Sequence, residues 1–358
     1  MELEDLGWSE SLGNSFVGLR ETLVNVEPAR VVAAQREHYR LLAPQGALDA
    51  QLSGRLRHDA LEGELPVVGD WVAAQLRPEE GGATIAACLP RKTSLIRKRV
   101  GRASAPQVLA ANLDVVFLVT SLNADLNARR IERTLAMIWE GGAQPVVLLT
   151  KLDLCSDPQR SVEDIEAVAL GVPVHALSSL SGEGVDVLQR YLHRGRTLAL
   201  IGSSGVGKST LANRLIGEER LTISEVRASD DKGRHTTTSR ELFVLPSGAL
   251  LIDTPGMREL GLWDAGAGIG ATFEDIGRLA ITCRFGDCRH QREPGCAIHA
   301  AIANGNLEQA RWRSYEKLQR ELAHEARRHN PQAMAAHKDH YRSIFKARNQ
   351  VTRKSPKT

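Results

Sequence analysis

The stretch GSSGVGKST, from Gly202 to Thr210, decides the fold of the centre of this chain. It fits the pattern G-x-x-x-x-G-K-[ST], a glycine loop whose backbone N–H groups surround phosphate oxygens. The apolar run TLALI before it predicts a buried strand, and Leu211 and Leu215 after it share one helical face before a stop at Gly217. A strand, a glycine loop and a helix N-terminus in this order predict a site for a nucleoside triphosphate.

Two side chains of this loop have predicted tasks. The ammonium of Lys208 should meet the outer phosphates, and the hydroxyl of Ser209 should bind Mg²⁺. We expect the whole loop to contact the nucleotide, namely Gly202, Ser203, Ser204, Gly205, Val206, Gly207, Lys208, Ser209 and Thr210.

Length and composition indicate an ordinary soluble protein of two or three domains. The chain has 358 residues, of which 42% are hydrophobic and 25% charged. No apolar run approaches the roughly 18 residues that span a bilayer, and the acidic N-terminus MELEDLGWSE lacks the features of a signal peptide. We therefore expect a cytoplasmic protein with no membrane partner.

Charge is distributed unevenly along the chain. Residues 311–358 hold 13 Lys and Arg against 4 Asp and Glu, whereas the other 310 residues hold 33 against 39. A basic segment attached to a mildly acidic body favours a polyanionic partner. The alternative is that these residues form a solvated face of a helix.

The C-terminal third contains a cluster of metal-binding residue types. The spacing C-x4-C-x-H-x5-C joins four of them, namely Cys283, Cys288, His290 and Cys296. In a cytoplasmic chain such a cluster favours a metal over disulfides. Three thiolates and one imidazole suit a closed tetrahedral Zn²⁺ site with a structural role. Asp287 and His299 are alternative ligands nearby.

The first hundred residues predict a small β-domain. Glycine and proline separate five short strands, ARVVAAQ, HYRLLA, DAQLSGRLR, VVGDWVAAQL and ATIAACLP. Five strands in about 60 residues predict an OB-fold barrel, whose open face often binds nucleic acid. The alternative is a β-domain that only packs against its neighbour. The basic run RKTSLIRKRVGR at 91–102 either contacts a phosphate backbone or is a solvated linker.

From Leu113 onward strands and helices alternate, which predicts a doubly wound α/β domain. DVVFLVTS, PVVLLT and VPVHAL are its predicted strands before TLALI. A capping pattern of Ser161 with Asp164 predicts the start of one helix, and VDVLQRYL predicts another. Ligands of such a domain bind at the carboxyl ends of its strands.

Two loops at these strand ends have residues suited to reading guanine. The sequence TKLD is close to N-K-x-D, in which the Asp carboxylate accepts the N1 and N2 hydrogens of guanine. It comprises Thr150, Lys151, Leu152 and Asp153, with Thr150 where Asn is usual. After VPVHAL, the backbone N–H groups around Ser178 and Ser179 would meet the guanine oxygen.

Two further segments should sense the γ-phosphate. In the sequence DTPG, Asp253 should reach Mg²⁺ through water, and the N–H of Gly256 should sense the phosphate. The polar segment SDDKGRHTTTSR at 229–240 reads as a mobile switch loop. Its Thr236 or Thr237 should contact the nucleotide and complete the Mg²⁺ shell.

The order of the motifs is permuted, because TKLD precedes the phosphate loop. Together with GRHTTT, PVVGDW and the cysteine cluster, this order resembles the ribosome small subunit-dependent GTPase A family (RsgA/YjeQ family) over about residues 29–325. The resemblance implies hydrolysis of GTP to GDP and phosphate, with GTP or GDP, Mg²⁺ and one structural Zn²⁺ as cofactors. It also implies a monomer that binds the small ribosomal subunit and its rRNA during late maturation of that subunit, and whose hydrolysis the subunit stimulates.

The residue that orients the attacking water is not obvious, since Met257 stands where Ras-type proteins place Gln. Our hypothesis from the family is that His235 orients this water, acting beside Lys208 and Gly256; the alternative is that His235 contacts the ribosome.

Two other function classes stay open. One is a P-loop kinase, which preference for ATP would favour. The other is a zinc-containing RNA-binding protein with a structural nucleotide. We expect five segments: an extension at 1–28, an OB-fold at 29–100, a circularly permuted GTPase domain at 101–265, a helical zinc-binding domain at 266–325, and a basic tail at 326–358 whose last 20 or so residues order on binding.

Overall fold

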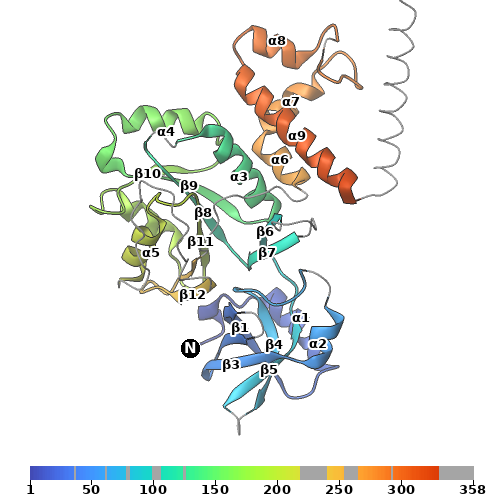
Figure 1. Ribbon diagram of the computed structural model, residues 1–358, viewed down its shortest axis with the longest axis vertical. Coiled ribbons are helices and arrows are strands. Elements are labelled where there is room, and N and C mark those ends of the chain that lie inside the picture. The colour runs from blue at the N-terminus through green and yellow to red at the C-terminus, as the bar shows by residue number, and fades with distance from the viewer. Residues whose placement is uncertain are drawn as a thin grey trace, which may run out of the picture.

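The computed structural model describes residues 1–35, 38–60, 63–77, 81–98, 106–123, 126–217, 240–253, 265–291 and 293–329. Three bodies follow one another along the long axis of Figure 1, a β-barrel, an α/β domain and a group of helices. Four predicted site residues, His235, Thr236, Thr237 and Gly256, lie outside the described residues.

The N-terminal barrel has five strands, as the spacing of the apolar runs predicted. They are β1 (Val26–Gln35), β2 (His38–Ala43), β3 (Gly46–Leu52), β4 (Trp71–Arg77) and β5 (Gly82–Cys88). The order is β1-β2-β3-β5-β4, and pairing of β1 with β4 closes the barrel. The strand β3 runs parallel to β5 while the other pairs are antiparallel. This is the connectivity of an OB-fold, and alternate side chains fill its interior.

One predicted strand ends earlier than expected. The run DAQLSGRLR continues beyond β3 as a short helix, α2 (Gly54–Asp59), and not as a strand. The hydroxyl of Ser53 accepts a hydrogen bond from the N–H of Leu56 at 3.1 Å. A serine N-cap of this kind satisfies one of the free N–H groups at a helix start, which makes the turn favourable here.

The N-terminal extension packs against the barrel. It forms a turn of 3-10 helix, η1 (Glu4–Leu6), and the helix α1 (Glu10–Arg20). Leu6 is fully buried, and the ring of Trp8 meets Trp71 edge-on at 4.7 Å between centroids. Burying aromatic rings of this size removes a large apolar area from water, which accounts for the ordered position of the extension.

The central sheet is mostly parallel and carries helices on its faces. Its strands are β8 (Val115–Ser121), β9 (Gln144–Thr150), β10 (Val174–Ala176), β11 (Thr197–Ile201), β12 (Arg240–Val244) and β13 (Leu250–Asp253), in the order β10-β9-β8-β11-β13-β12. The helical elements between them are α3 (Ala128–Glu140), η3 (Leu152–Leu154), α4 (Pro158–Glu166), η4 (Val185–Tyr191) and α5 (Lys208–Ile216). All of β8 and β11 is buried, as expected for inner strands of a doubly wound sheet.

One local prediction in this domain is wrong. The helix α4 begins at Pro158 with Asp157 as its N-cap, so Ser161 lies inside the helix and its hydroxyl contacts the carbonyl of Asp157 at 3.2 Å. Proline at the first helical position fixes φ without losing a hydrogen bond, and therefore sets an earlier start. The run VDVLQRYL forms a helix as predicted, and it is the 3-10 helix η4.

The barrel and the α/β domain share one continuous sheet. Strand β12 pairs with β1, with Ala33 opposite Glu241 and Ala34 opposite Arg240. A separate hairpin, β6 (Ser94–Lys98) with β7 (Pro106–Ala111), lies near this junction (Figure 1). At the start of the basic run, Arg91 holds the buried carboxylate of Asp70 through two 2.8 Å contacts, so this arginine has a structural role.

The C-terminal helices dock on α3. They are α6 (Gly266–Thr272), α7 (Glu274–Ile281), α8 (Ala297–Ala303) and α9 (Gln309–His329), built around Phe273, Ile276, Ile298 and Trp312. At Gly268 a Cβ would lie 1.8 Å from the carbonyl oxygen of Ala136, so α6 and α3 approach closely at this point. None of the helices in the described ranges is long and apolar enough to cross a membrane.

Candidate functional site

The strand ends of the central sheet bring the separate motifs together at one edge. In the sheet register, Thr150 is paired with Ser121, Ile201 with Leu118, and Asp253 with Leu200. The phosphate loop follows Ile201, and TKLD begins at Thr150. Motifs that lie about fifty residues apart along the chain therefore meet where a doubly wound sheet binds its ligands.

The phosphate loop depends on glycine at its two ends. Gly202 has φ of 148°, and a Cβ there would lie 2.0 Å from the carbonyl oxygen of Val119. Gly207 has φ of 92° and is the N-cap residue of α5. Within the described ranges, the N–H groups from Ser204 to Gly207 have no hydrogen-bond partner. Free N–H groups at a helix N-terminus form a site for an anion such as phosphate.

The ammonium group of Lys208 lies over this loop. Its Nζ donates to the carbonyl oxygens of Gly202 at 2.8 Å and Ser203 at 2.5 Å. Ser209 and Thr210 follow in the first turn of α5 and are half-buried. The loop therefore combines free N–H groups, a positive helix end and a cation, all of which favour a polyphosphate.

The side chain of Thr150 is an anchor inside the domain. It is fully buried, and its Oγ1 lies 2.6 Å from the carbonyl oxygen of Val206 and 3.1 Å from that of Thr120. Lys151 has φ of 62°, and this left-handed residue turns the chain into η3. The carboxylate of Asp153 is exposed on that turn, where it is accessible to a ligand.

The second predicted guanine loop follows β10. Ser178 is fully buried, and its hydroxyl accepts from the N–H of Ser181 at 3.1 Å. A 3.2 Å hydrogen bond from the Leu152 N–H to the Leu177 carbonyl joins this loop to TKLD. Within the part of the chain that the structure describes, the N–H groups of Ser179 and Leu180 have no partner. They are donors available to a carbonyl oxygen of a base.

Sequence reasoning missed Arg214, which belongs to this region. Its guanidinium on α5 donates to the carbonyl oxygens of Ser179 at 3.0 Å and Leu180 at 2.7 Å. No signal in the sequence points to this role, because an arginine on the exposed side of an amphipathic helix normally indicates a solvated face.

The γ-phosphate sensors are described only in part. Asp253 ends β13 and is half-buried beside β11, next to the phosphate loop. The predicted switch residues and the glycine of DTPG belong to segments outside the described residues, so their roles stay predictions.

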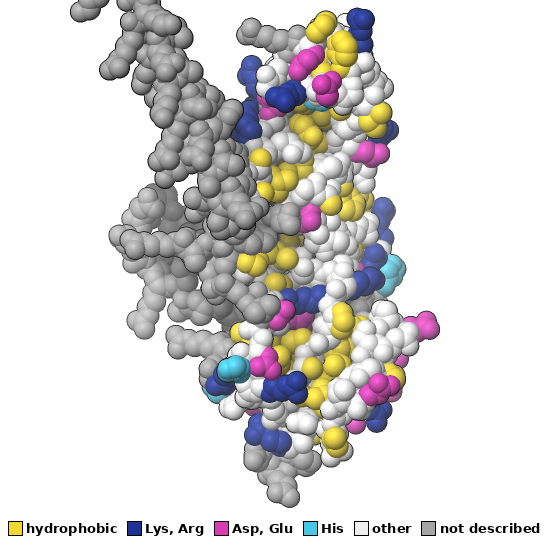
Figure 2. Space-filling view, turned by 90° about the vertical axis from the view of Figure 1, so that its right-hand side faces the viewer, with side chains coloured by type: hydrophobic (Ala, Val, Ile, Leu, Met, Phe, Trp, Pro, Cys, Tyr) yellow, Lys and Arg dark blue, Asp and Glu magenta, His cyan; other side chains and the backbone are white. Residues whose placement is uncertain are grey.

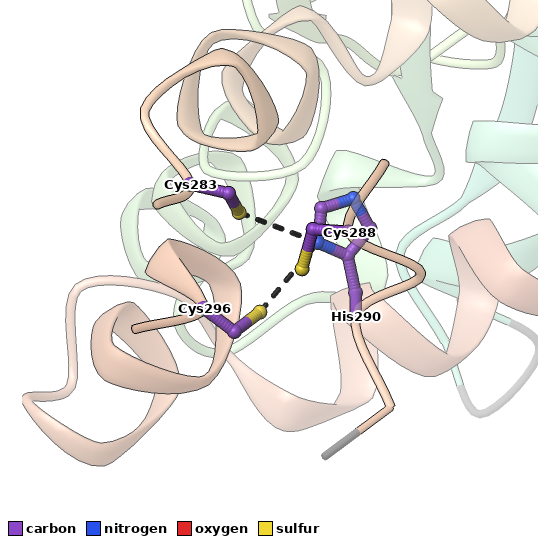
Figure 3. Close-up of side chains that lie close together, drawn as sticks. All are labelled: Cys283, Cys288, His290 and Cys296. Carbon is purple, nitrogen blue, oxygen red and sulfur yellow. Dashed lines mark hydrogen bonds between the residues drawn. The ribbon is translucent and has the colours of Figure 1, made fainter. Parts of the chain in front are cut away.

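The cysteine cluster converges as its spacing predicted (Figure 3). Cys283 follows α7, Cys296 precedes α8, and Cys288 and His290 come from the loop between these helices. Their ligand atoms all lie within 4.8 Å of one another. The Nδ1 of His290 lies 3.5 Å from the Sγ atoms of Cys283 and Cys296.

These distances fit a tetrahedral metal ion. With metal–sulfur and metal–nitrogen bonds of about 2.3 and 2.1 Å, a tetrahedral site places sulfur about 3.6 Å from nitrogen. His299 instead directs its Nε2 to the carbonyl oxygen of His290 at 3.0 Å, and Asp287 is exposed and outside the cluster. The four residues named from the sequence could therefore hold one metal ion, and the two alternatives are not needed.

Comparison with known proteins identifies the family. The model of the RsgA GTPase family matches residues 88–263. The small ribosomal subunit biogenesis GTPase RsgA of Opitutus terrae is 47% identical over 355 residues, which is 96% of each chain. The chain belongs to the RsgA GTPase family. Its relative of the same name in Syntrophotalea carbinolica is 46% identical over 331 residues, or 90% of each chain.

Solved structures of similar proteins confirm the permuted fold. The crystal structure of YjeQ from Thermotoga maritima is 27% identical, with a TM-score of 0.62, over 83% of this chain and 99% of that one. YloQ, described as a circularly permuted GTPase, is 25% identical with a TM-score of 0.59 over 84% and 96%. Membership of this family implies GTP hydrolysis, and thus GTP, GDP and Mg²⁺ as ligands.

Proposed function

We propose that this chain hydrolyses GTP during biogenesis of the small ribosomal subunit, and that the subunit stimulates the reaction. The observation that carries the proposal is the meeting of a phosphate loop with unpaired N–H groups and the exposed Asp153 at one sheet edge. The relatives that are 46–47% identical over nearly the whole chain are named for this activity.

Hydrogen-bond acceptors and donors of the protein together select the base. The carboxylate of Asp153 accepts the N1 and N2 hydrogens of guanine, and the N–H groups of Ser179 and Leu180 donate to its O6. Adenine has an amino group at the position of O6, so these N–H groups would face a donor, and each unmatched polar group costs about 1–3 kcal/mol. This arrangement favours GTP over ATP.

The phosphates are bound by the loop and the helix end. The N–H groups from Ser204 to Gly207 and the ammonium of Lys208 hold the phosphate oxygens, while Ser209 would bind Mg²⁺ directly and Asp253 would reach it through water. Held there, Mg²⁺ would neutralise the negative charge of the phosphate oxygens. His235 orients the attacking water, with a ribosome contact as the alternative role of this histidine.

We infer that Zn²⁺ occupies the cluster of Cys283, Cys288, His290 and Cys296. A closed site of three thiolates and one imidazole leaves no position for substrate, so its role is structural. The loop that it closes joins α7 to α8, and the ring of His290 meets Trp312 of α9 at 5.8 Å. The metal therefore fixes three of the C-terminal helices.

The barrel and the C-terminal helices would contact ribosomal RNA. On the face in Figure 2, basic side chains form a band just above the barrel. Nucleotide state can reach the barrel through β12, because this strand follows the switch segment in the chain and pairs with β1. Association with the subunit would then depend on whether GTP or GDP is bound, with a cytoplasmic monomer as the acting form.

The test is the hydrolysis rate with and without purified small subunits, with ATP as the control nucleotide. We expect GTP turnover to rise when subunits are added and ATP turnover to stay at background. Equal rates for both nucleotides, or no response to subunits, would contradict the proposal.

A second experiment tests the guanine contact. Asp153→Asn replaces an acceptor by a donor and should shift preference from GTP to xanthosine triphosphate, whose C2 substituent is an oxygen. For the catalytic hypothesis, His235→Ala should bind GTP normally but lose stimulated turnover. Unchanged single-turnover hydrolysis by that variant would leave the ribosome contact as the explanation of His235.

A further inference from the structure

Arg214 connects the phosphate-loop helix to the predicted guanine loop. It lies two turns into α5, and its guanidinium donates to the carbonyl oxygens of two consecutive residues, Ser179 and Leu180. The loop closes around the guanidinium at Gly182, where a Cβ would lie 2.6 Å from Nη1. Gly182 has φ of 96°, so both its conformation and its close approach favour glycine. The loop is thus shaped to this one side chain.

These contacts determine where the loop's N–H groups point. In a trans peptide the N–H of the next residue lies opposite the carbonyl. Because the Ser179 carbonyl faces Arg214, the Leu180 N–H faces away from α5. The next peptide shows the same rule, since the Leu180 carbonyl also faces Arg214 and the Ser181 N–H bonds the hydroxyl of Ser178 on the loop's inner side. Arg214 therefore orients one of the two N–H groups that are left for a base, that of Leu180.

Thr150 stands where the N-K-x-D pattern has Asn, so the guanine loop lacks the support that an Asn would give from this position. A threonine offers one hydroxyl proton, whereas the Asn usual at this position has two donors and one acceptor. The shorter contact of Thr150 is to the Val206 carbonyl, in the phosphate loop. Gly207 lies next to the hydroxyl groups of both Thr150 and Ser179. Within the described ranges, the hydroxyl of Ser179 is buried without a hydrogen-bond partner. The side-chain hydrogen bonds that the structure describes for Thr150 go to Thr120 and Val206 and not to the guanine loop.

We propose that Arg214 is a positioning residue for guanine recognition. From α5 it supports the Ser179–Leu180 loop, which Thr150 at the end of β9 cannot do. The inference rests on the proposed function and specifies one of its determinants. Arg214 does not touch the nucleotide; it fixes the peptide whose N–H meets O6 of the base.

Removing the guanidinium of Arg214 should therefore lower the affinity for nucleotides according to their base and not according to their phosphates. Arg214→Met keeps the apolar stem but removes the donors. We expect affinity for GDP to fall about tenfold, the effect of losing one well-placed hydrogen bond of about 1.4 kcal/mol. Inosine diphosphate retains O6 and should lose affinity by the same factor, while ADP, which has no O6, should be unaffected. With GTP, KM should rise and kcat at saturation should stay unchanged.

Titration calorimetry of the full-length protein with GDP, inosine diphosphate and ADP measures these factors. Arg278→Met is the matched control, since Arg278 lies on the exposed side of α7 in an ion pair with Glu274. Arg214→Lys keeps the positive charge of the side chain but removes the planar guanidinium. A single ammonium cannot donate to two carbonyls as a planar fork does, so most of the loss should remain.

A double-mutant cycle tests the link with Thr150. An Asn at 150 could bond both the Val206 carbonyl and the Ser179 hydroxyl, so in a Thr150→Asn chain the Arg214→Met change should cost about threefold or less. An equal loss of GDP affinity from Arg214→Met in the unmodified chain and in the Thr150→Asn chain would overturn the idea that Arg214 compensates for Thr150. A GDP loss below about twofold, or an equal loss for ADP, would overturn the positioning role. Failure of the proposed function itself would look different, because the unmodified protein would then show no preference for GDP over ADP.

Discussion

The guanidinium of Arg311 crosses the junction between the C-terminal helices and the α/β domain, and removing it should weaken that junction strongly. It donates to Glu132 of α3 at 2.9 Å and to both carboxylate oxygens of Asp275 at 2.8 Å. It also donates to the carbonyl oxygens of Val168 and Thr272 at 3.0 Å. Only 5% of its side chain and 2% of that of Glu132 are exposed. The perturbation is Arg311→Met, which keeps most of the volume and none of the donors.

The expected magnitude follows from what is left behind. Among the residues that the structure describes, the buried Glu132 carboxylate then keeps one polar partner, the Ser314 hydroxyl at 2.5 Å. Removing one member of a buried ion pair in this way costs about 3–5 kcal/mol, because the other charge remains desolvated. The guanidinium also lies 4.9 Å from the ring of Phe273, and that contact is lost as well. We therefore expect the C-terminal helices to be destabilised by about 3–5 kcal/mol near neutral pH.

The effect should depend on pH with a definite sign. Burial raises the pKa of Glu132 despite the opposing effects of Ser314 and Arg311, and loss of Arg311 should raise that pKa further. A carboxyl group with a raised pKa in the folded state binds its proton more tightly when folded, so lower pH favours the folded form. The deficit of the variant should shrink as pH falls toward the range in which Glu132 is protonated.

Hydrogen exchange in α3 and α9, followed against urea at several pH values, measures this deficit by region. Arg278→Met is the control, because its pair with Glu274 is about 70% exposed and such pairs contribute under about 1 kcal/mol. Adding Glu132→Gln to Arg311→Met should recover part of the loss by removing the buried charge. A deficit no larger than that of the control, or one that does not change with pH, would refute the reasoning.

Three further predictions concern other parts of the chain. Gly268→Ala should destabilise the docking of α6 by about 1–3 kcal/mol or more, whereas Gly270→Ala, where a Cβ meets nothing within 4 Å, should be neutral or stabilising in thermal melts. Cys296→Ser should reduce bound zinc well below one equivalent per chain by elemental analysis, while Cys155→Ser, a cysteine outside the cluster, should retain the metal. Burial and Arg190 lower the pKa of His175, so the unfolded chain takes up this proton more readily and stability falls as pH drops below the ordinary range of a histidine; His175→Gln should weaken this acid sensitivity, and an unchanged profile would contradict it.

Much of the candidate site could be predicted because its chemistry is local. The phosphate loop lies within nine consecutive residues, and the four metal ligands lie within fourteen. Short spacing and residue type suffice there, because the backbone of a single turn or loop brings the groups together. The five barrel strands were also found, because alternation and turn residues are read over a few positions.

Local signals failed where two of them competed. The Ser161 pattern was overruled by Asp157 and Pro158, which start the same helix one turn earlier. The run DAQLSGRLR predicts a strand that continues through Arg57, but Ser53 caps a helix at that point. In each case both the predicted and the observed element fit the local sequence. The capping residue decided between them, because its side-chain oxygen accepts a hydrogen bond from a backbone N–H of the first helical turn.

The sequence by itself determined which chemical groups this protein has: a phosphate loop, a carboxylate after a buried strand, and a set of metal ligands. Only the tertiary structure decided how they are connected. Arg311 and Glu132 are 179 residues apart in the chain, and Arg214 and Ser179 are 35 apart. The pairing of β1 with β12 joins two domains through hydrogen bonds that no side-chain pattern encodes. Such contacts depend on how whole elements pack, because an exposed helix face and a sheet edge look the same in sequence whether or not a partner covers them.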